Sequence, residues 1–225
     1  MTDLALSRVD KFLTGVSTRP ASRGNLVFAL DATASRERTW DTACQLQARM
    51  FQEVAMIGSL SMQLVYFRGA QDLGGECKAS RWVDNPADLA SIMTKIRCDA
   101  GYTQIGRVLG HVAREASRRK VSALVFVGDA CEEDRDQLIE PAKQLAQLGV
   151  PAFMFQEGNE RVARSRFQEI ARITRGVHLA FDQGAARQLS ELLRAVAAFS
   201  VGGTTALEKQ SSAAAKYMLQ QIKSR

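Results

Sequence analysis

Several features that often reveal a protein's role are absent from this sequence. No apolar run approaches the length of a membrane span, and residues 1–10 lack the basic and apolar regions of a secretory signal. The two histidines, His111 and His178, lie far apart, and no phosphate-binding glycine loop, dinucleotide fingerprint or nucleophile elbow occurs. The sequence therefore argues against a membrane protein, a histidine-based metal site and the commonest nucleotide-binding or serine-hydrolase enzymes.

Cysteine is scarce and follows no metal-binding spacing. The four cysteines are far apart and include no Cys-x-x-Cys pair; they are Cys44, Cys77, Cys98 and Cys131. With 225 residues, of which 46% are hydrophobic, the chain can build one sizeable core without disulfide bonds. We expect all four thiols to be reduced and the protein to be cytoplasmic.

Positive charge is in excess, but the sequence does not cluster it. The formal net charge is +6, and the lysines and arginines are spread over most predicted helices with acids between them. The longest basic run is Arg118-Arg119-Lys120. Because clustering rather than net charge marks a nucleic-acid-binding surface, we expect no nucleic-acid partner.

The most informative stretch begins at Asn25. Residues 26–30 are apolar and contain no glycine or proline, which predicts a buried strand, and Asp31 ends this run abruptly. Thr33 and Ser35 follow at alternate positions, so the strand end offers only oxygen donors, which suit Mg²⁺ or Ca²⁺ rather than zinc or copper. Since Ser, Thr and Asp also commonly cap helices, this stretch by itself is equally typical of a strand followed by a helix.

Two later stretches repeat parts of this design. Thr103 lies in a loop bounded by Gly101 and Gly106, just before a helical pattern, and Asp129 ends a second apolar run at residues 124–128. In open α/β folds, ligands bind at the edge where parallel strands end. A strand that ends in Asp places its carboxylate at that edge.

Together these residues resemble the metal-ion-dependent adhesion site (MIDAS) of the von Willebrand factor type A (VWA) domain. The MIDAS pattern is Asp-x-Ser-x-Ser, then a distant Thr, then a distant Asp. The matching residues here are Asp31, Thr33, Ser35, Thr103 and Asp129, and the resemblance covers about residues 25–200. The first hydroxyl belongs to Thr rather than the commoner Ser, and a glycine precedes the last Asp where the family often has one after it.

The resemblance implies a function as well as a fold. In that family the first two hydroxyls and the distant Thr contact the metal, so Thr33, Ser35 and Thr103 are the expected direct ligands, and Asp31 and Asp129 balance the charge. A bound Mg²⁺, or Mn²⁺ or Ca²⁺, that touches few anions stays electrophilic and favours an Asp or Glu of a partner. The resemblance thus implies a non-catalytic protein-interaction module of the bacterial cytosolic type, working beside an AAA+ ATPase or in a stress-resistance system.

Strands and helices alternate along the chain, which predicts a doubly wound α/β fold with a mostly parallel sheet and helices on both faces. We expect one antiparallel edge strand, because a Gly-Gly break makes a hairpin between the second and third strands. Predicted strands cover residues 25–31, 61–68, 77–83, 122–128, 152–155 and 177–181; predicted helices cover residues 3–13, 36–57, 87–96, 103–118, 136–148, 162–174 and 185–199.

Three segments follow from this pattern. Residues 1–24 are predicted to be a helix and linker, residues 25–200 the VWA domain, and residues 201–225 a polar C-terminal tail or helix. The last segment has few apolar residues, so we expect it to stay outside the main core and its deletion to change stability little.

Acidic residues crowd the region after Asp129. Glu132, Glu133, Asp134 and Asp136 are typical of a helix start, where acids interact favourably with the helix dipole. The alternative interpretation is a negative collar that attracts cations to the same edge.

A haloacid-dehalogenase-type phosphatase is the alternative function. A strand that ends in Asp-x-Thr and a later one that ends in Gly-Asp also resemble that family, with Asp31 as the nucleophile and Asp129 and Asp134 as Mg²⁺ ligands. The required lysine would have to be Lys120, which is predicted at a strand start away from the site. Thr103 would also have no role, so the metal-dependent interaction module is the preferred prediction.

Overall fold

The computed structural model describes residues 24–36, 60–69, 75–181 and 186–223. The helices predicted at residues 3–13 and 36–57, and the linker between residues 14 and 23, lie outside the described residues. The sheet has six strands in the order β3-β2-β1-β4-β5-β6. These strands are β1 (Gly24–Asp31), β2 (Leu60–Arg68), β3 (Glu76–Ala79), β4 (Ala123–Gly128), β5 (Ala152–Glu157) and β6 (His178–Phe181).

All neighbouring strands are parallel except β3, which pairs antiparallel with β2 at one edge of the sheet. This arrangement confirms the predicted fold class. β4 and β5 are buried along their whole length, because helices cover both faces of the sheet and leave no solvent-facing side to these strands. Their near-continuous apolar sequences are the reason that the strand positions could be predicted.

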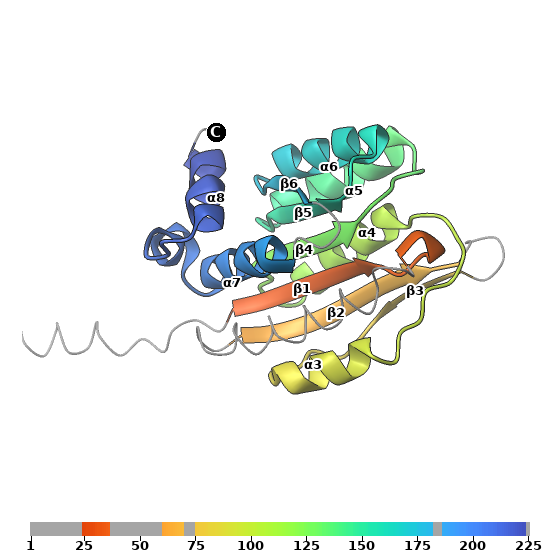
Figure 1. The fold of residues 1–225 in the computed structure, drawn as a ribbon, viewed down its shortest axis with the longest axis horizontal. Helices are drawn as coiled ribbons and strands as arrows, with labels where there is room; N and C mark the ends of the chain where they lie inside the picture. The colour runs from red at the N-terminus through yellow and green to blue at the C-terminus, as the bar shows by residue number, and fades with distance from the viewer. Residues whose placement is uncertain (1–23, 37–59, 70–74, 182–185, 224–225) are drawn as a thin grey trace, which may run out of the picture.

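Helices cover the two faces of the sheet, as Figure 1 shows. The helices are α3 (Pro86–Met93), α4 (Ile105–Ala116), α5 (Arg135–Gln147), α6 (Arg161–Ile173), α7 (Ala186–Glu208) and α8 (Ala213–Lys223). Residues of α3, α7 and α8 belong to the apolar cluster on one face, and residues of α4, α5 and α6 to the cluster on the other. Among the described helices, none combines the length and apolar character that a membrane span requires.

The edge strand β3 is shorter than predicted, because the chain leaves the ladder at Ser80. The Ser80 backbone N–H still donates to the Leu64 carbonyl at 2.8 Å, but the Ser80 hydroxyl, in place of a backbone carbonyl, accepts from the Leu64 N–H at 3.0 Å. Pairing resumes only at an isolated bridge between Met62 and Val83.

The C-terminal segment differs more from the prediction. α7 continues past the predicted end at residue 199, bends at Gly202 and Gly203, and leads into α8. Leu207 and Met218 have no exposed surface and belong to the apolar cluster on the α7 face. The expectation that this segment stays outside the main core is therefore wrong, since a few well-spaced apolar side chains at the end of α7 and on α8 are enough to join it.

Candidate functional site

Two aspartates end neighbouring strands at the carboxyl edge of the sheet. β1 and β4 are adjacent and parallel, and Leu30 pairs with Val127. Asp31 and Asp129 therefore lie just beyond the last paired residues of the two strands, at the same edge of the sheet. A Cβ placed on Gly128 would lie only 3.5 Å from the Asp31 Cβ, which shows how closely the two strand ends approach. The fold thus brings the two carboxylates predicted from separate motifs to one edge.

The residues after Asp31 form a short connected turn. Asp31 Oδ1 accepts a hydrogen bond from the Thr33 backbone N–H at 2.8 Å, and the Thr33 and Ser35 hydroxyl oxygens lie 3.1 Å apart. A 3₁₀ turn, η1 (Ala34–Arg36), carries Ser35. Asp31 is fully buried, Thr33 is nearly so and Ser35 is exposed, so these oxygens lead from the interior to the surface.

Backbone contacts bring the Thr103 loop to the same edge. Asp99 forms an isolated bridge with Thr33, and its N–H donates to the Ala32 carbonyl at 3.0 Å. Gly101 packs directly on Gly69, where an added Cβ would come within 2.2 Å of the Gly69 carbonyl carbon. Only glycine allows this approach, which explains why the loop needs glycine just before Thr103.

Thr103 is held in turn by the loop that follows Asp129. Its backbone N–H donates to the Glu132 carboxylate at 3.0 Å, and its hydroxyl accepts from the Glu132 backbone N–H at 3.1 Å. The hydroxyl oxygen keeps a second lone pair with which it can bind a cation. The structure therefore joins all three predicted motifs at one edge, although Thr103 is held through Glu132.

The neighbouring Glu133 caps the start of α4. Its carboxylate accepts backbone N–H groups from Ile105 at 2.5 Å and Gly106 at 2.8 Å. Burial raises the pKa of the Glu133 carboxyl above its ordinary value, and these two hydrogen bonds oppose that effect. An added Cβ on Gly106 would lie 3.1 Å from Glu133 Oε1, so this glycine makes room for the cap.

This capping corrects the interpretation of the acidic stretch. Glu132 and Glu133 were expected to serve the start of α5 or to form a cation-attracting collar, yet both bind backbone N–H groups at the start of α4. The sequence held a signal for this: the N-cap residue of α4 is Gln104, which is not a preferred N-cap type, and the first turn has no acid. In the structure Gln104 makes no side-chain capping bond. When a helix has no cap of its own, its first backbone N–H groups need acceptors from another part of the chain.

The oxygens at this edge suit a hard cation. Asp129 Oδ1 is buried, and it accepts no hydrogen bond from any residue that the structure describes. A buried carboxylate oxygen without a partner is costly, and a cation would satisfy it. Within the described residues, no group of three or more His, Cys, Asp or Glu side chains is placed to hold a metal ion. A site here would therefore mix two carboxylates with hydroxyls, as predicted, and its ligand set stays a prediction.

The lysine that the phosphatase alternative requires lies at the opposite edge of the sheet. The Lys120 carbonyl accepts a hydrogen bond from the Asn25 side-chain amide at 2.6 Å, beside the start of β1. Asp134, the other required residue, is exposed at the N-cap of α5. Lys120 therefore lies at the wrong edge of the sheet to act as the lysine partner of Asp31.

Three of the four cysteines, Cys77, Cys98 and Cys131, lie within the described residues, and both histidines have internal partners. Cys77 and Cys131 are free thiols, and burial raises the pKa of Cys131 to about 12. Cys44 lies outside the described residues. The imidazole nitrogens of His111 and His178 pair with the Gln63 and Gln156 side-chain amides at 2.9 and 3.1 Å. Each histidine is therefore held by a glutamine side chain of the sheet, and these hydrogen bonds involve neither Asp31 nor Asp129.

Solved structures with the same architecture include several VWA domains. A von Willebrand factor type A protein from Catenulispora acidiphila superposes with a TM-score of 0.60 at 17% identity, over 80% of this chain and 43% of that one. The chain has the fold of a VWA domain. The SpRpn10 VWA domain gives a TM-score of 0.56 at 14% identity, over 77% of this chain and 95% of that one.

A third structure with the VWA fold comes from Bacteroides fragilis. It is an aerotolerance-related membrane protein, with a TM-score of 0.59 at 14% identity, over 76% of this chain and 96% of that one. No protein-family model and no curated protein matches the chain. At these identities the likeness establishes the fold alone, and the chain spans less than half the length of the Catenulispora protein.

Proposed function

We propose that this VWA-fold chain is a cytoplasmic, non-catalytic, divalent-metal-dependent protein-interaction module. Asp31, Thr33, Ser35, Thr103 and Asp129 would hold Mg²⁺, or Mn²⁺ or Ca²⁺, as a MIDAS. The bound ion would supply an electrophilic position for an Asp or Glu carboxylate of a partner protein. The observation that carries the proposal is the buried Asp129 Oδ1, which lacks a hydrogen bond among the described residues beside the fully buried Asp31.

The chain's own contacts support this role by fixing the oxygens before any ion binds. Asp31 orients Thr33 through its backbone N–H, and Glu132 holds both the N–H and the hydroxyl of Thr103. Side chains fixed by such contacts lose little conformational entropy on binding a ligand.

The fold and the thiols support the rest of the proposal. VWA domains generally act as protein-interaction modules, and one protein of similar fold is aerotolerance-related, which agrees with a partner in a stress-resistance or AAA+ ATPase system. The free thiols of Cys77 and Cys131 agree with a reducing compartment.

Capture of a partner tests the proposal. The immobilised chain should retain a partner from a bacterial lysate in Mg²⁺ and release it in EDTA, and Thr103→Ala should abolish the capture. Thr94→Ala is the matched control, because it removes the same groups from an exposed position at the end of α3. Mg²⁺-dependent hydrolysis of an aryl phosphate that Asp31→Asn abolishes and Thr103→Ala spares would contradict the proposal and favour the phosphatase.

A further inference from the structure

Three hollows follow one another along the outer side of α4, beginning at the candidate metal site. The first, of about 490 Å³, is lined in part by Thr103, Gly106 and Arg107. The second, of about 300 Å³, shares Gly106 and Arg107 with the first, and the third, of about 380 Å³, shares Gly110 and Arg114 with the second. The first and third hollows lie against α5, and the second lies on the other side of α4 against β2 and β3, so together they flank the outer face of α4. We call this surface, with its hollows, the α4 groove.

Small and neutral side chains line much of the α4 groove. Gly110 lies on this surface, and an added Cβ there would meet only the end of the Arg114 side chain, at 3.7 Å, so another backbone can approach the helix closely. The facing helix α5 contributes glutamine side chains, whose amides both donate to and accept from a peptide backbone; they are Gln137, Gln144 and Gln147. These are the features of a surface that binds polypeptide.

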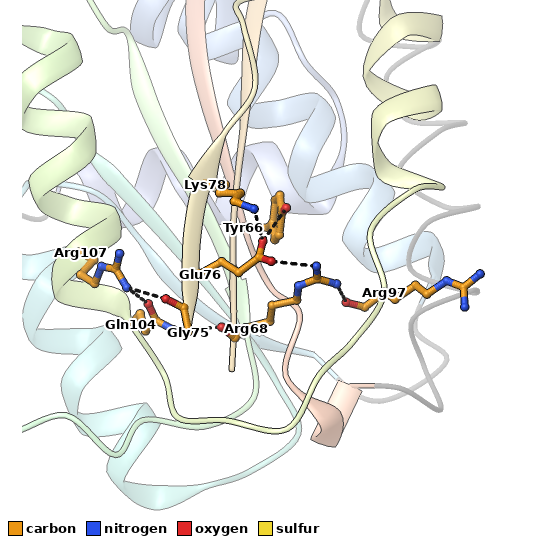
Figure 2. A network of polar contacts seen from close by, with 8 residues as sticks. All are labelled: Tyr66, Arg68, Gly75, Glu76, Lys78, Arg97, Gln104 and Arg107. Carbon is orange, nitrogen blue, oxygen red and sulfur yellow. Dashed lines mark hydrogen bonds and ion pairs between the residues drawn. The ribbon is translucent and has the colours of Figure 1, made fainter. Parts of the chain in front are cut away.

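Two exposed arginines give the α4 groove a positive charge. Figure 2 shows that the Arg107 guanidinium turns to neutral groups, the Gly75 carbonyl and the Gln104 side chain, at 3.3 and 2.5 Å. Neither Arg107 nor Arg114 forms an ion pair with any described carboxylate, whereas Arg68 is paired with Glu76.

The acids of the groove lie only at its Thr103 end. Glu132 and Glu133 line the first hollow, and both carboxylates are already bound to backbone N–H groups of the Thr103 loop and α4. The positive charge further along the helix is therefore left for a ligand to balance.

We propose that the α4 groove binds an acidic, extended segment of the same partner protein whose carboxylate binds the metal. This inference rests on the proposed function and specifies its partner. At about 1.5 Å per helical residue, Arg107 and Arg114 lie roughly 10 Å apart along α4. At about 3.1 Å per residue in an extended polyproline II conformation, in which every third side chain lies on the same face, two carboxylates three residues apart would match them.

A polypeptide fits this groove better than a nucleic acid does. Among the residues that line the groove in the described part of the chain, Tyr102 is the prominently exposed aromatic side chain, so there is little surface on which bases could stack. Nucleic-acid affinity depends on neutralising many phosphates, and two arginines supply few such contacts.

A labelled peptide with aspartate at every third position, and glycine or serine between, is a direct probe. Its anisotropy is measured with the full chain in Mg²⁺ and in EDTA, beside a matched asparagine peptide and an oligothymidine of similar length. Arg107→Gln with Arg114→Gln should weaken binding of the aspartate peptide about fivefold or more in both buffers, because each arginine pairs directly with a carboxylate. Arg161→Gln with Arg172→Gln removes the same charge from exposed positions of α6 and should leave binding unchanged.

The outcomes separate this inference from the proposed function. If Mg²⁺ does not change peptide binding but Arg107→Gln with Arg114→Gln still weakens it, the result supports the α4 groove and contradicts the metal site. The groove proposal is overturned if the aspartate peptide fails to bind, if both double variants bind it equally, or if the asparagine peptide binds as well. Tighter binding of the oligothymidine would overturn it in favour of a nucleic-acid surface.

Discussion

Carboxylates in two regions of the molecule differ in whether their oxygens have partners. In the β2–β3 cluster of Figure 2, Glu76 lies within 3.0 Å of Arg68, Lys78 and the Tyr66 hydroxyl, and these partners lower the pKa of Glu76 to about 2. At the β1–β4 edge, Asp129 keeps a buried oxygen with no hydrogen bond among the described residues. Glu76 lies near the surface with cationic partners, whereas the buried Asp129 Oδ1 lies in no ion pair with a cationic side chain that the structure describes.

This difference supports the proposal that the β1–β4 edge is a functional site and the Glu76 cluster a structural one. An exposed ion pair contributes only about 0–1 kcal/mol, so the Glu76 cluster ties the edge strand to the sheet without much effect on stability. A buried polar group without a partner costs about 1–3 kcal/mol, and a protein retains such a cost where a ligand offsets it.

The largest expected effect is at Asp129. With Mg²⁺ at about a hundredfold excess over its Kd, the wild-type chain should gain roughly 2.7 kcal/mol, and Asp129→Asn should lose that gain. In EDTA the same variant should be at least as stable as the wild type, because it removes a buried negative charge. Thermal melts in both buffers measure this, and an Asn variant that is less stable in EDTA yet still responds to Mg²⁺ would break the comparison.

Glu133 sharpens the comparison, because it is half-buried like Asp129 but paired like Glu76. Replacing it by Gln turns an amide N–H group toward the backbone donors of Ile105 and Gly106, which should lower the free energy of unfolding by about 1–3 kcal/mol. Urea denaturation measures the change. Asp134→Asn is the control: its side chain makes no capping bond, so it should stay within about 0.5 kcal/mol of the wild type. Equal effects of the two changes would show that Glu133 does not cap α4.

The smallest effect is expected at Glu76. Glu76→Gln should change stability by less than about 1 kcal/mol at neutral pH. Because the folded pKa of about 2 lies below the ordinary value of 4.5, the stabilisation is present above pH 4.5 and is lost as the pH falls toward 2. The wild type should therefore lose more stability than the variant across that range, as acid titrations followed by circular dichroism can show. Parallel curves for the two proteins would contradict this.

The sequence was sufficient for the fold because its strands are continuous apolar runs. Residues 26–30 and 124–128 could be read as neighbouring buried strands, and the carboxylates that end them, Asp31 and Asp129, do lie at one edge. The end of such a strand can be located from the sequence alone, because the first polar residue after the apolar run marks it.

Contacts between distant segments could not be read in the same way. The cap of α4 comes from Glu133, which lies 27 residues away from Gly106, and a local rule assigned it to the nearer helix α5. The packing of Met218 in α8 depends on the bend at Gly202 and Gly203, which sets where the last helix lies. Both outcomes are decided by tertiary structure and leave only weak marks in the local sequence.

The most direct test of the account is a calorimetric titration of the metal-free chain with Mn²⁺. We predict that the wild type binds a single ion, that Asp129→Asn abolishes this binding, and that Glu76→Gln leaves it unchanged, because Asp129 Oδ1 has no hydrogen-bond donor among the described residues whereas Glu76 is already paired. The absence of binding to the wild type, or equal binding by all three proteins, would contradict the central claim that the β1–β4 edge is a metal site.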